Sequence, residues 1–406
     1  MTGSMYAAIA GLKTHMQNLN VIGNNIANIN TQGYKSSRSV FKSSIYTTMT
    51  GGSNGTTVTG GRNPSQIGYG ANIANIGIDM STGNYSVTGN PTDIMIDGNG
   101  FLMVGDKDIA MNFTGQGSTD VNVLKSLDLT RVGDLDFKAD GYLCNGDGRP
   151  VYGFLCIGYY EEGEELPPGM KVGSPKYSDQ LVPIRLPRVY TNTPEDGGVS
   201  TIEIGWPSNL VRGVDDENAE LGGGENGNMH LLDYGSYIDA DGNVIPSEYE
   251  RASVTGITID RTTGLITATC GDRNNEIITI GCIALGTVTN PNGVTNLGNN
   301  YYKAGEGSGD LRVSLCGGAA ESMGISHINS SLITDEENPE DGTTISDALR
   351  IRDSDTELIS NGLEQSKTDL AQEIASMIVT QRGYQANTRI VTVTDSMLEE
   401  LVNMKR

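Results

Sequence analysis

Both ends of the chain repeat apolar residues at helical spacing. Near the start, apolar residues recur in steps of four and three, which places them on one stripe of a helix. The stripe consists of Met5, Ile9, Leu12, Met16, Leu19, Gly23 and Ile26. Ser4 is a suitable N-cap, and turn-forming residues from Asn28 to Gly33 should end the helix. The pattern therefore predicts a coiled-coil-like helix in this region.

The same pattern covers a longer stretch near the end of the sequence. Its positions are Leu363, Lys367, Leu370, Ile374, Met377, Gln381, Tyr384, Thr388, Val391, Asp395, Leu398 and Val402. They predict a helix from about Gly362 to Asn403. Four of these positions are polar, and polar residues in a helical seam lower stability while fixing register and partner number. Two such helices could simply pack on their own domain. Because Gly, Ser, Thr and Asn-rich segments (47–61 and 334–344) border them, we instead expect them to find partners outside the central body.

Between these stretches the pattern becomes that of β-structure. From Ile73 to Gly153, short runs alternate or are rich in β-branched residues, and glycine-containing turns separate them. Asp-Gly pairs suited to type I′ hairpins begin at Asp97, Asp140, Asp147 and Asp241. We predict a mainly β fold, with antiparallel β domains in the centre and long N- and C-terminal α-helices that pair as a coiled-coil-like inner domain.

Charge narrows the possible partners. The chain of 406 residues has a formal net charge of −23, which disfavours binding to nucleic acid or to anionic membranes. No apolar run is long enough to insert into a membrane, and the start lacks the basic n-region of a cleavable signal peptide. Residues 1–78 contain five basic residues and no acidic one. This asymmetry suggests that the start meets different neighbours from the middle.

Little in the sequence supports catalysis or metal binding. There are only 3 His and 5 Cys, without CxxC or HxxxH motifs. The acids of residues 239–250 resemble a calcium loop, but the required glycine is displaced, so we predict a hairpin turn there. The five cysteines are interpreted as small buried hydrophobes. We therefore expect no enzyme, cofactor or metal. A secreted acidic β-rich enzyme or adhesin with helical tails is the alternative from another class.

One motif is specific. Residues 24–35, NNIANINTQGYK, resemble the signature of bacterial flagellar axial proteins, the rod and hook family. Further blocks similar to that family follow in order at 88–104, 129–154, 298–309 and 381–405, while residues 159–275 are left unmatched. The positions matched to the two terminal motifs are Asn24, Asn25, Asn28, Asn30, Thr31, Gly33, Tyr34, Lys35, Gln381, Arg382, Tyr384, Gln385 and Asn387.

The resemblance implies a structural role. Residues 1–29 with 362–406 would form an inner helical assembly domain, 30–72 a linker, 73–154 with 277–361 a middle β domain, and 155–276 an outer β domain inserted into it. The implied self-assembly interface consists of Met5, Ile9, Leu12, Met16, Leu19, Ile26, Leu370, Ile374, Met377, Tyr384, Val391, Leu398 and Val402.

Length favours the hook over the shorter distal rod protein, which is the nearer alternative. The resemblance thus implies a subunit of the curved, flexible, hollow hook, a universal joint that transmits torque from rod to filament in motility. Its expected partners are copies of itself, the distal rod protein, the hook cap protein, the hook–filament junction protein and the flagellar type III export apparatus. Its expected location is the flagellar hook and basal body, outside the cell after export.

Overall fold

The chain forms two compact units. The computed structural model describes residues 2–55, 60–107, 111–112, 124–163, 170–178, 180–192, 201–205, 236–238, 244–246, 250–317 and 351–404. Unit 1 joins Met1–Met80 with Ser366–Arg406, and unit 2 is Ser81–Gln365. The two ends of the chain therefore belong to one unit, and each unit is considered by itself below.

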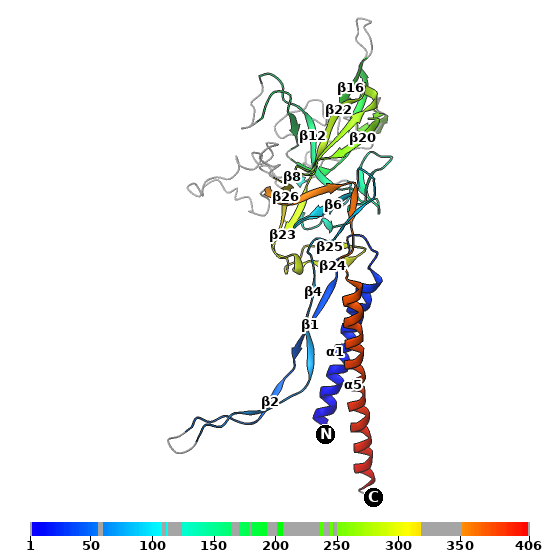
Figure 1. Ribbon diagram of the computed structural model, residues 1–406. Helices are drawn as coiled ribbons and strands as arrows, with labels where there is room; N and C mark the ends of the chain where they lie inside the picture. Colours follow the sequence, from blue (N-terminus) through cyan, green and yellow to red (C-terminus); the bar gives the residue numbers. More distant parts are fainter. Residues whose placement is uncertain are drawn as a thin grey trace. The chain divides into compact units, whose positions relative to one another are not determined.

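Unit 1 consists of two long helices and two antiparallel pairs of strands (Figure 1). Its elements are α1 (Thr2–Ala27), β1 (Ser37–Ser43), β2 (Tyr46–Thr50), β3 (Ser65–Gly68), β4 (Ala71–Ile78) and α5 (Leu370–Asn403). β1 pairs antiparallel with β4, and β2 pairs antiparallel with β3. α1 packs on α5 and also contacts β1 and β4. Residues 30–72, predicted as a linker, thus contain β1, β2, β3 and the start of β4.

Both helices start at positions different from those predicted. α1 already includes Thr2, so Ser4 lies inside the helix and the predicted N-cap is wrong. α5 starts at Leu370 because the carboxylate of Asp369 accepts hydrogen bonds from the backbone N–H groups of Ala371 (2.9 Å) and Gln372 (3.2 Å). The eight residues before Leu370 were wrongly included in the predicted helix. They contain a strand, and Lys367 is consequently not a helical seam position.

Unit 2 is built almost entirely of short strands. Its elements are β5 (Tyr85–Val87), β6 (Ile94–Asp97), β7 (Phe101–Val104), β8 (Met111–Asn112), β9 (Asp128–Thr130), β10 (Leu135–Phe137), β11 (Leu143–Asn145), β12 (Tyr152–Tyr159), β13 (Pro175–Tyr177), β14 (Gln180–Pro183), β15 (Arg188–Asn192), β16 (Thr201–Gly205), β17 (Ser236–Ile238), β18 (Val244–Pro246), β19 (Glu250–Arg251), β20 (Val254–Ile259), β21 (Leu265–Cys270), η2 (Gly271–Arg273), β22 (Glu276–Ile283), β23 (Leu285–Val288), η3 (Pro291–Gly293), β24 (Thr295–Gly298), β25 (Tyr301–Lys303), β26 (Leu311–Cys316), β27 (Arg352–Ser354), β28 (Glu357–Ser360) and β29 (Gly362–Glu364).

Two sheets dominate unit 2. One has the order β20-β21-β22-β12-β14-β8, with β13 also paired to β12, and the other has the order β24-β25-β9-β7-β23-β26-β27. Smaller groups are β16-β15-β19, β10-β11, β17-β18, β28-β6 and β29-β5. Among the described strand pairs, only β26 and β27 run parallel. The prediction of a mainly β, antiparallel centre flanked by terminal helices is confirmed.

One hydrophobic core joins the two large sheets. It contains fully buried side chains such as Leu102 on β7, Ile266 on β21 and Leu285 on β23. The predicted boundary between a middle and an outer domain crosses β12 and β22, which pair with Phe154 opposite Cys282. Several residues of the predicted outer domain, 155–276, lie outside the described ranges. The division of unit 2 into middle and outer domains stays a prediction.

The turns at the Asp-Gly pairs have a different backbone conformation from the one predicted. In the three Asp-Gly pairs that the structure describes, only the glycine has a positive φ: 125° at Gly98, 80° at Gly141 and 80° at Gly148. A type I′ turn needs positive φ at both central residues, so this part of the prediction is wrong. Asn299 and Asn300, between paired β24 and β25, do have φ of 51° and 61°. Asp241 lies outside the described residues, although β17 and β18 on either side of it pair as a hairpin should.

All five cysteines are buried and none forms a disulfide. Burial raises the pKa of the Cys144 thiol to about 11 and that of Cys156 to about 12. These thiols are therefore neutral at physiological pH and unreactive in the folded protein. Their interpretation as small buried hydrophobes is confirmed.

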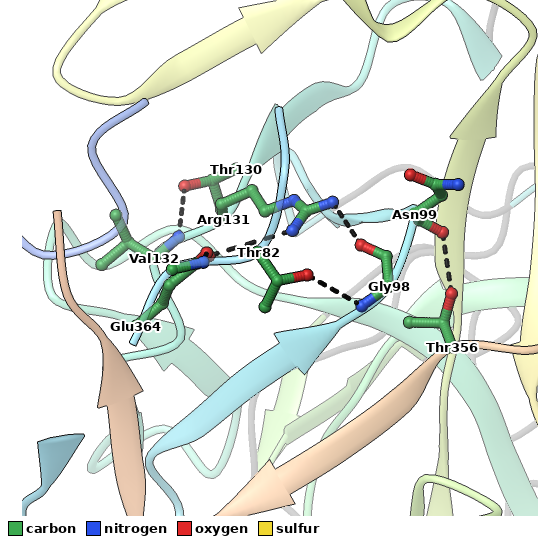
Figure 2. Close-up of polar contacts among 9 residues, drawn as sticks. Thr82, Gly98, Asn99, Thr130, Arg131, Val132, Thr356 and Glu364 are labelled. Carbon is green, nitrogen blue, oxygen red and sulfur yellow. Dashed lines mark hydrogen bonds and ion pairs between the residues drawn. The ribbon is translucent and has the colours of Figure 1, made fainter. Parts of the chain in front are cut away.

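A buried arginine connects several segments of unit 2 (Figure 2). Arg131, which follows β9, donates from Nη2 to the carbonyl of Gly98 at 2.7 Å. Its Nη1 lies 3.9 Å from Oε2 of Glu364 on β29, and both side chains are only 1% exposed. Glu364 also accepts a hydrogen bond from the backbone N–H of Gly83 at 2.5 Å. Burial lowers the pKa of Arg131, and the attraction of Glu364 opposes this shift. Glu364 on the last strand of unit 2 thus contacts both the segment before β5 and the segment after β9.

Candidate assembly interface

Small and polar side chains make close contacts between α1 and α5 within one chain. Asn18 donates from Nδ2 to the Thr380 hydroxyl at 2.8 Å, and Asn25 donates from Nδ2 to the Glu373 carboxylate at 2.9 Å. Two further contacts pair a glycine of one helix with a larger residue of the other: Gly11 with Asn387, and Gly383 with His15. All four contacts share one antiparallel register. A methyl group at Gly383 would lie 2.7 Å from Cε1 of His15, so the helices are in close contact at this point.

A second face of α1 packs on the paired strands β1 and β4. The Thr14 hydroxyl donates to the carbonyls of Ala10 at 2.7 Å and of Ala71, on β4, at 2.9 Å. Gly70 has a φ of +104°, and a Cβ there would lie 2.9 Å from the carbonyl oxygen of Ala7. A side chain is therefore excluded at Gly70 by both conformation and space. The His15 ring also contacts Phe41 of β1, with centroids 5.9 Å apart.

The predicted interface residues keep part of their apolar surface exposed in the single chain. Those exposed in the single chain are Ile9, Met16, Leu370, Ile374, Tyr384 and Val402. Those half-buried are Met5, Leu12, Leu19, Ile26, Met377, Val391 and Leu398. None of the thirteen is fully buried. Their assignment to contacts between subunits stays a prediction, and the single chain leaves their apolar surface available for such contacts.

The motif at 24–35 forms a dense hydrogen-bond network at the end of α1. Asn25, only 1% exposed, is its centre. Its Oδ1 accepts from the backbone N–H of Ser37 at 2.9 Å and from the Tyr34 hydroxyl at 3.0 Å, while its Nδ2 also donates to the Ser37 carbonyl at 2.8 Å. Burial, and to a lesser degree Glu373, raises the pKa of Tyr34, which keeps the hydroxyl protonated as a donor. The network fixes α1 to β1 and α5.

Neighbouring residues of the same motif shape the turn after α1. Asn28 donates to the Asn24 carbonyl at 2.9 Å, and the Thr31 hydroxyl donates to Asn28 at 3.1 Å. Gly33 has a φ of 67°, which a residue with a side chain rarely adopts. Lys35 is buried at 2% exposure, and Asn30 is exposed. These positions serve the local fold of unit 1.

The C-terminal motif residues are distributed over different faces of α5. Gln381, Arg382, Tyr384 and Gln385 are exposed, with a hydrogen bond from Arg382 to Gln385 at 3.4 Å, whereas Asn387 faces Gly11. Sequence reasoning missed the face of α5 that packs on α1, because it is polar. Its signal is a seven-residue spacing of small or polar residues, Glu373, Thr380, Asn387 and Thr394.

Two structural findings concern the remaining sequence predictions. Within the described ranges, no cluster of three or more His, Cys, Asp or Glu side chains is arranged to hold a metal ion, and no helix is long and apolar enough to span a membrane. His230 and His327 lie outside the described residues, and His15 belongs to the helix contact.

Comparison with known proteins finds similarity to one family. Residues 5–35 match the family model "Flagella basal body rod protein", and residues 359–404 match "Flagellar basal body rod FlgEFG protein C-terminal". The chain is 27% identical to the "Flagellar basal-body rod protein FlgG" of Bacillus subtilis over 406 aligned residues, covering 100% of both chains. It is 26% identical to the "Flagellar hook protein FlgE" of Borreliella burgdorferi, again over 100% of both. Both ends of the chain thus match models of the flagellar rod and hook family, and full-length rod and hook proteins are similar to the whole chain.

This similarity indicates the general role. Flagellar rod and hook proteins are structural components of the flagellum that assemble into polymeric structures of its basal body and hook, and they serve motility. The relatives include both rod and hook proteins. A crystal structure of the Helicobacter pylori hook protein FlgE2 superposes with a TM-score of 0.26 at 11% identity, over 56% of this chain and 95% of that one, which is too low to support a structural argument.

Proposed function

We propose that this chain is the subunit of the bacterial flagellar hook, a curved and flexible hollow tube that transmits torque from rod to filament. The observation that carries the proposal is that the terminal helices contact each other through one set of side chains and leave another, apolar set exposed. α1 and α5 contact each other through small and polar side chains and leave apolar ones outside, among them Ile374 on α5 at 44% exposure. Exposed apolar stripes on terminal helices are stabilised when neighbouring subunits cover them.

The size of unit 2 favours the hook over the distal rod. Residues 155–276 are absent from the blocks that resemble the family, and an insertion of this length provides material for contacts on the outside of a tube. The distal rod protein remains the second candidate, since a full-length rod relative has nearly the same identity as the hook relative. The two candidate functions differ in the shape of the polymer, which would be curved for a hook subunit and straight for a rod subunit.

The proposal extends to partners and location. The subunit would pass through the flagellar type III export apparatus and meet the distal rod protein, the hook cap protein and the hook–filament junction protein, in the extracellular part of the flagellum. Its role would be mechanical, without enzymatic activity. The absence of disulfides among the five cysteines suits export of an unfolded chain.

Electron microscopy of polymer grown from the purified full-length protein tests this function. We expect curved hollow tubes. The variant Leu19→Asp should fail to form them, because each subunit contact would bury a carboxylate, while the circular dichroism of the monomer stays unchanged. Leu297→Asp on β24 is the matched control, since that leucine is 53% exposed in unit 2. Straight rods would favour the distal rod protein, and a monomer that never polymerises would contradict both.

A second variant tests the proposed outer domain. β12 and β22 are adjacent in one sheet, so a short Gly-Ser linker can join their ends when residues 159–275 are removed. Because the core of unit 2 includes residues of this range such as Ile266, the fold of the shortened protein is checked first by circular dichroism. A shortened protein that folds should polymerise into tubes of altered curvature, and unchanged curvature would remove the mechanical role of residues 159–275.

A further inference from the structure

α1 has a third face that nothing in the described chain covers. One face packs on α5 and another on β1 and β4, as shown above. The third, which we call the outer face of α1, consists of Tyr6, Ile9, Lys13 and Met16, spaced by three, four and three residues. Tyr6 is 62% exposed and Met16 is 50% exposed. Only Ile9 and Met16 belong to the stripe predicted from sequence.

The last turns of α5 are also uncovered. We call residues 397–403 the end segment of α5; its apolar side chains Met397, Leu401 and Val402 are 50%, 45% and 67% exposed. The register that pairs Gly11 with Asn387 carries these residues past Thr2, where the described part of α1 begins. Within the described chain, α1 therefore offers no residue opposite the end segment.

The two surfaces carry opposite charges. Lys13 lies in the middle of the outer face of α1, and Glu399 and Glu400 directly precede Leu401 and Val402. None of the three charged groups has an ion-pair partner among the described residues. They cannot pair within one chain, because the register places Lys13 beside the middle of α5, some 14 residues or roughly 20 Å along the axis from Glu399. These charges are too far apart to pair within one chain, and they are complementary between two copies.

We propose that the end segment of α5 in one subunit docks on the outer face of α1 in the next subunit, with Lys13 pairing to Glu399 or Glu400. This contact rests on the proposed function, and it names one surface through which the subunits of the polymer would meet. The dimensions agree, since the end segment is roughly 10 Å long and the outer face roughly 15 Å. Two different surfaces of each copy meet, so the contact is heterologous, and a heterologous contact whose rotation does not close propagates into an open helical polymer.

Charge reversal tests the contact on the full-length protein. The variants are Lys13→Glu, and Glu399→Lys combined with Glu400→Lys. In each variant alone, the docking surfaces carry the same sign, and we expect the critical concentration for polymerisation, measured by sedimentation, to rise about tenfold or more. Lys42→Glu on β1 makes the same charge change at an exposed position outside the outer face and should assemble like the original chain.

Mixing the two variants provides the decisive measurement. In a one-to-one mixture every contact between unlike copies joins opposite charges, so polymers should return at the original critical concentration with both variants in them. Assembly of the single variants at the original concentration would overturn the contact while leaving the hook function standing. Failure of the mixture, with both monomers folded by circular dichroism, would overturn it equally. Failure of the original chain to polymerise would instead count against the proposed function.

Discussion

The two units use their apolar residues in opposite ways. In unit 2, side chains such as Leu102, Leu285 and Leu315 have no exposed surface, and even the charged pair of Arg131 and Glu364 is buried. In α5, which the structure describes from end to end, the only buried residues are Thr380 and Thr394. Unit 2 therefore has its hydrophobic stabilisation within the chain, while unit 1 leaves much of its apolar surface exposed. Under the proposed function, folding and assembly would depend on different parts of one sequence.

Removing the buried charge of unit 2 should give the largest effect. Arg131→Met leaves Glu364 buried without a cation, which costs about 3–5 kcal/mol of the free energy of unfolding in comparable cases. Lys138→Met, at a lysine that is 40% exposed, should change the same quantity by less than about 0.5 kcal/mol. Urea unfolding followed by circular dichroism measures both. An Arg131→Met protein as stable as the original would mean that the ion pair contributes nothing to unit 2.

A pair of matched truncations compares the two units directly. Leu285→Ala removes a fully buried side chain from unit 2 and should lower its free energy of unfolding by about 2–5 kcal/mol. Ile374→Ala removes a 44% exposed side chain from α5 and should change monomer stability by less than about 0.5 kcal/mol, while weakening polymerisation. Urea titration gives the first quantity and sedimentation the second. Equal losses of monomer stability would erase the distinction between the units.

How far the sequence predicts this structure depends on how local the deciding interactions are. The apolar spacing predicted α1 to within a few residues, since one face of a helix repeats along the chain. The start of α5 was misjudged because Leu363 fits the helical stripe, although Gly362–Glu364 pairs with β5 as a strand. The contact between Arg131 and Glu364 joins residues far apart in sequence, and no periodic pattern of apolar residues predicts it.

The candidate interface was predicted only in part for a related reason. Apolar spacing identified residues that the single chain leaves uncovered, such as Ile9 and Ile374, but it could not identify the polar face that joins the helices. Asn25 was recognised as part of a family motif, yet its hydrogen bond to Glu373 depends on how α5 folds back beside α1. The hydrogen bonds of such polar residues cannot be predicted from local sequence, because they depend on partners that the fold brings together.

Removing the centre of the polar network should have an intermediate effect. Asn25→Ala deprives the Ser37 N–H, the Tyr34 hydroxyl and Glu373 of a buried partner, and we expect a loss of about 1–3 kcal/mol in the stability of unit 1. Asn20→Ala, at an exposed position of the same helix, should have little effect on the monomer. Hydrogen exchange at Ser37, read by mass spectrometry, reports the change. Unaltered protection in Asn25→Ala would show that the network does not hold α1 to β1.

Two glycines give the smallest expected effect. Substituting them distinguishes the contribution of helix propensity from that of the contact between the helices. Gly23 on α1 has no atom within 4 Å of the position its Cβ would occupy, so Gly23→Ala should stabilise the helix by about 0.5–1 kcal/mol. Gly383→Ala brings the same gain in propensity, but its methyl group would lie 2.7 Å from the His15 ring and must push the helices apart. We expect far-ultraviolet circular dichroism during thermal unfolding to show a higher midpoint for the first variant and a lower one for the second. The variant His15→Ala should remove the penalty at Gly383, because the obstructing ring is gone. If Gly383→Ala stabilised unit 1 as much as Gly23→Ala does, the close polar contact between α1 and α5 would not exist in the monomer, and the apolar faces would have to be reconsidered as the surfaces that join the two helices.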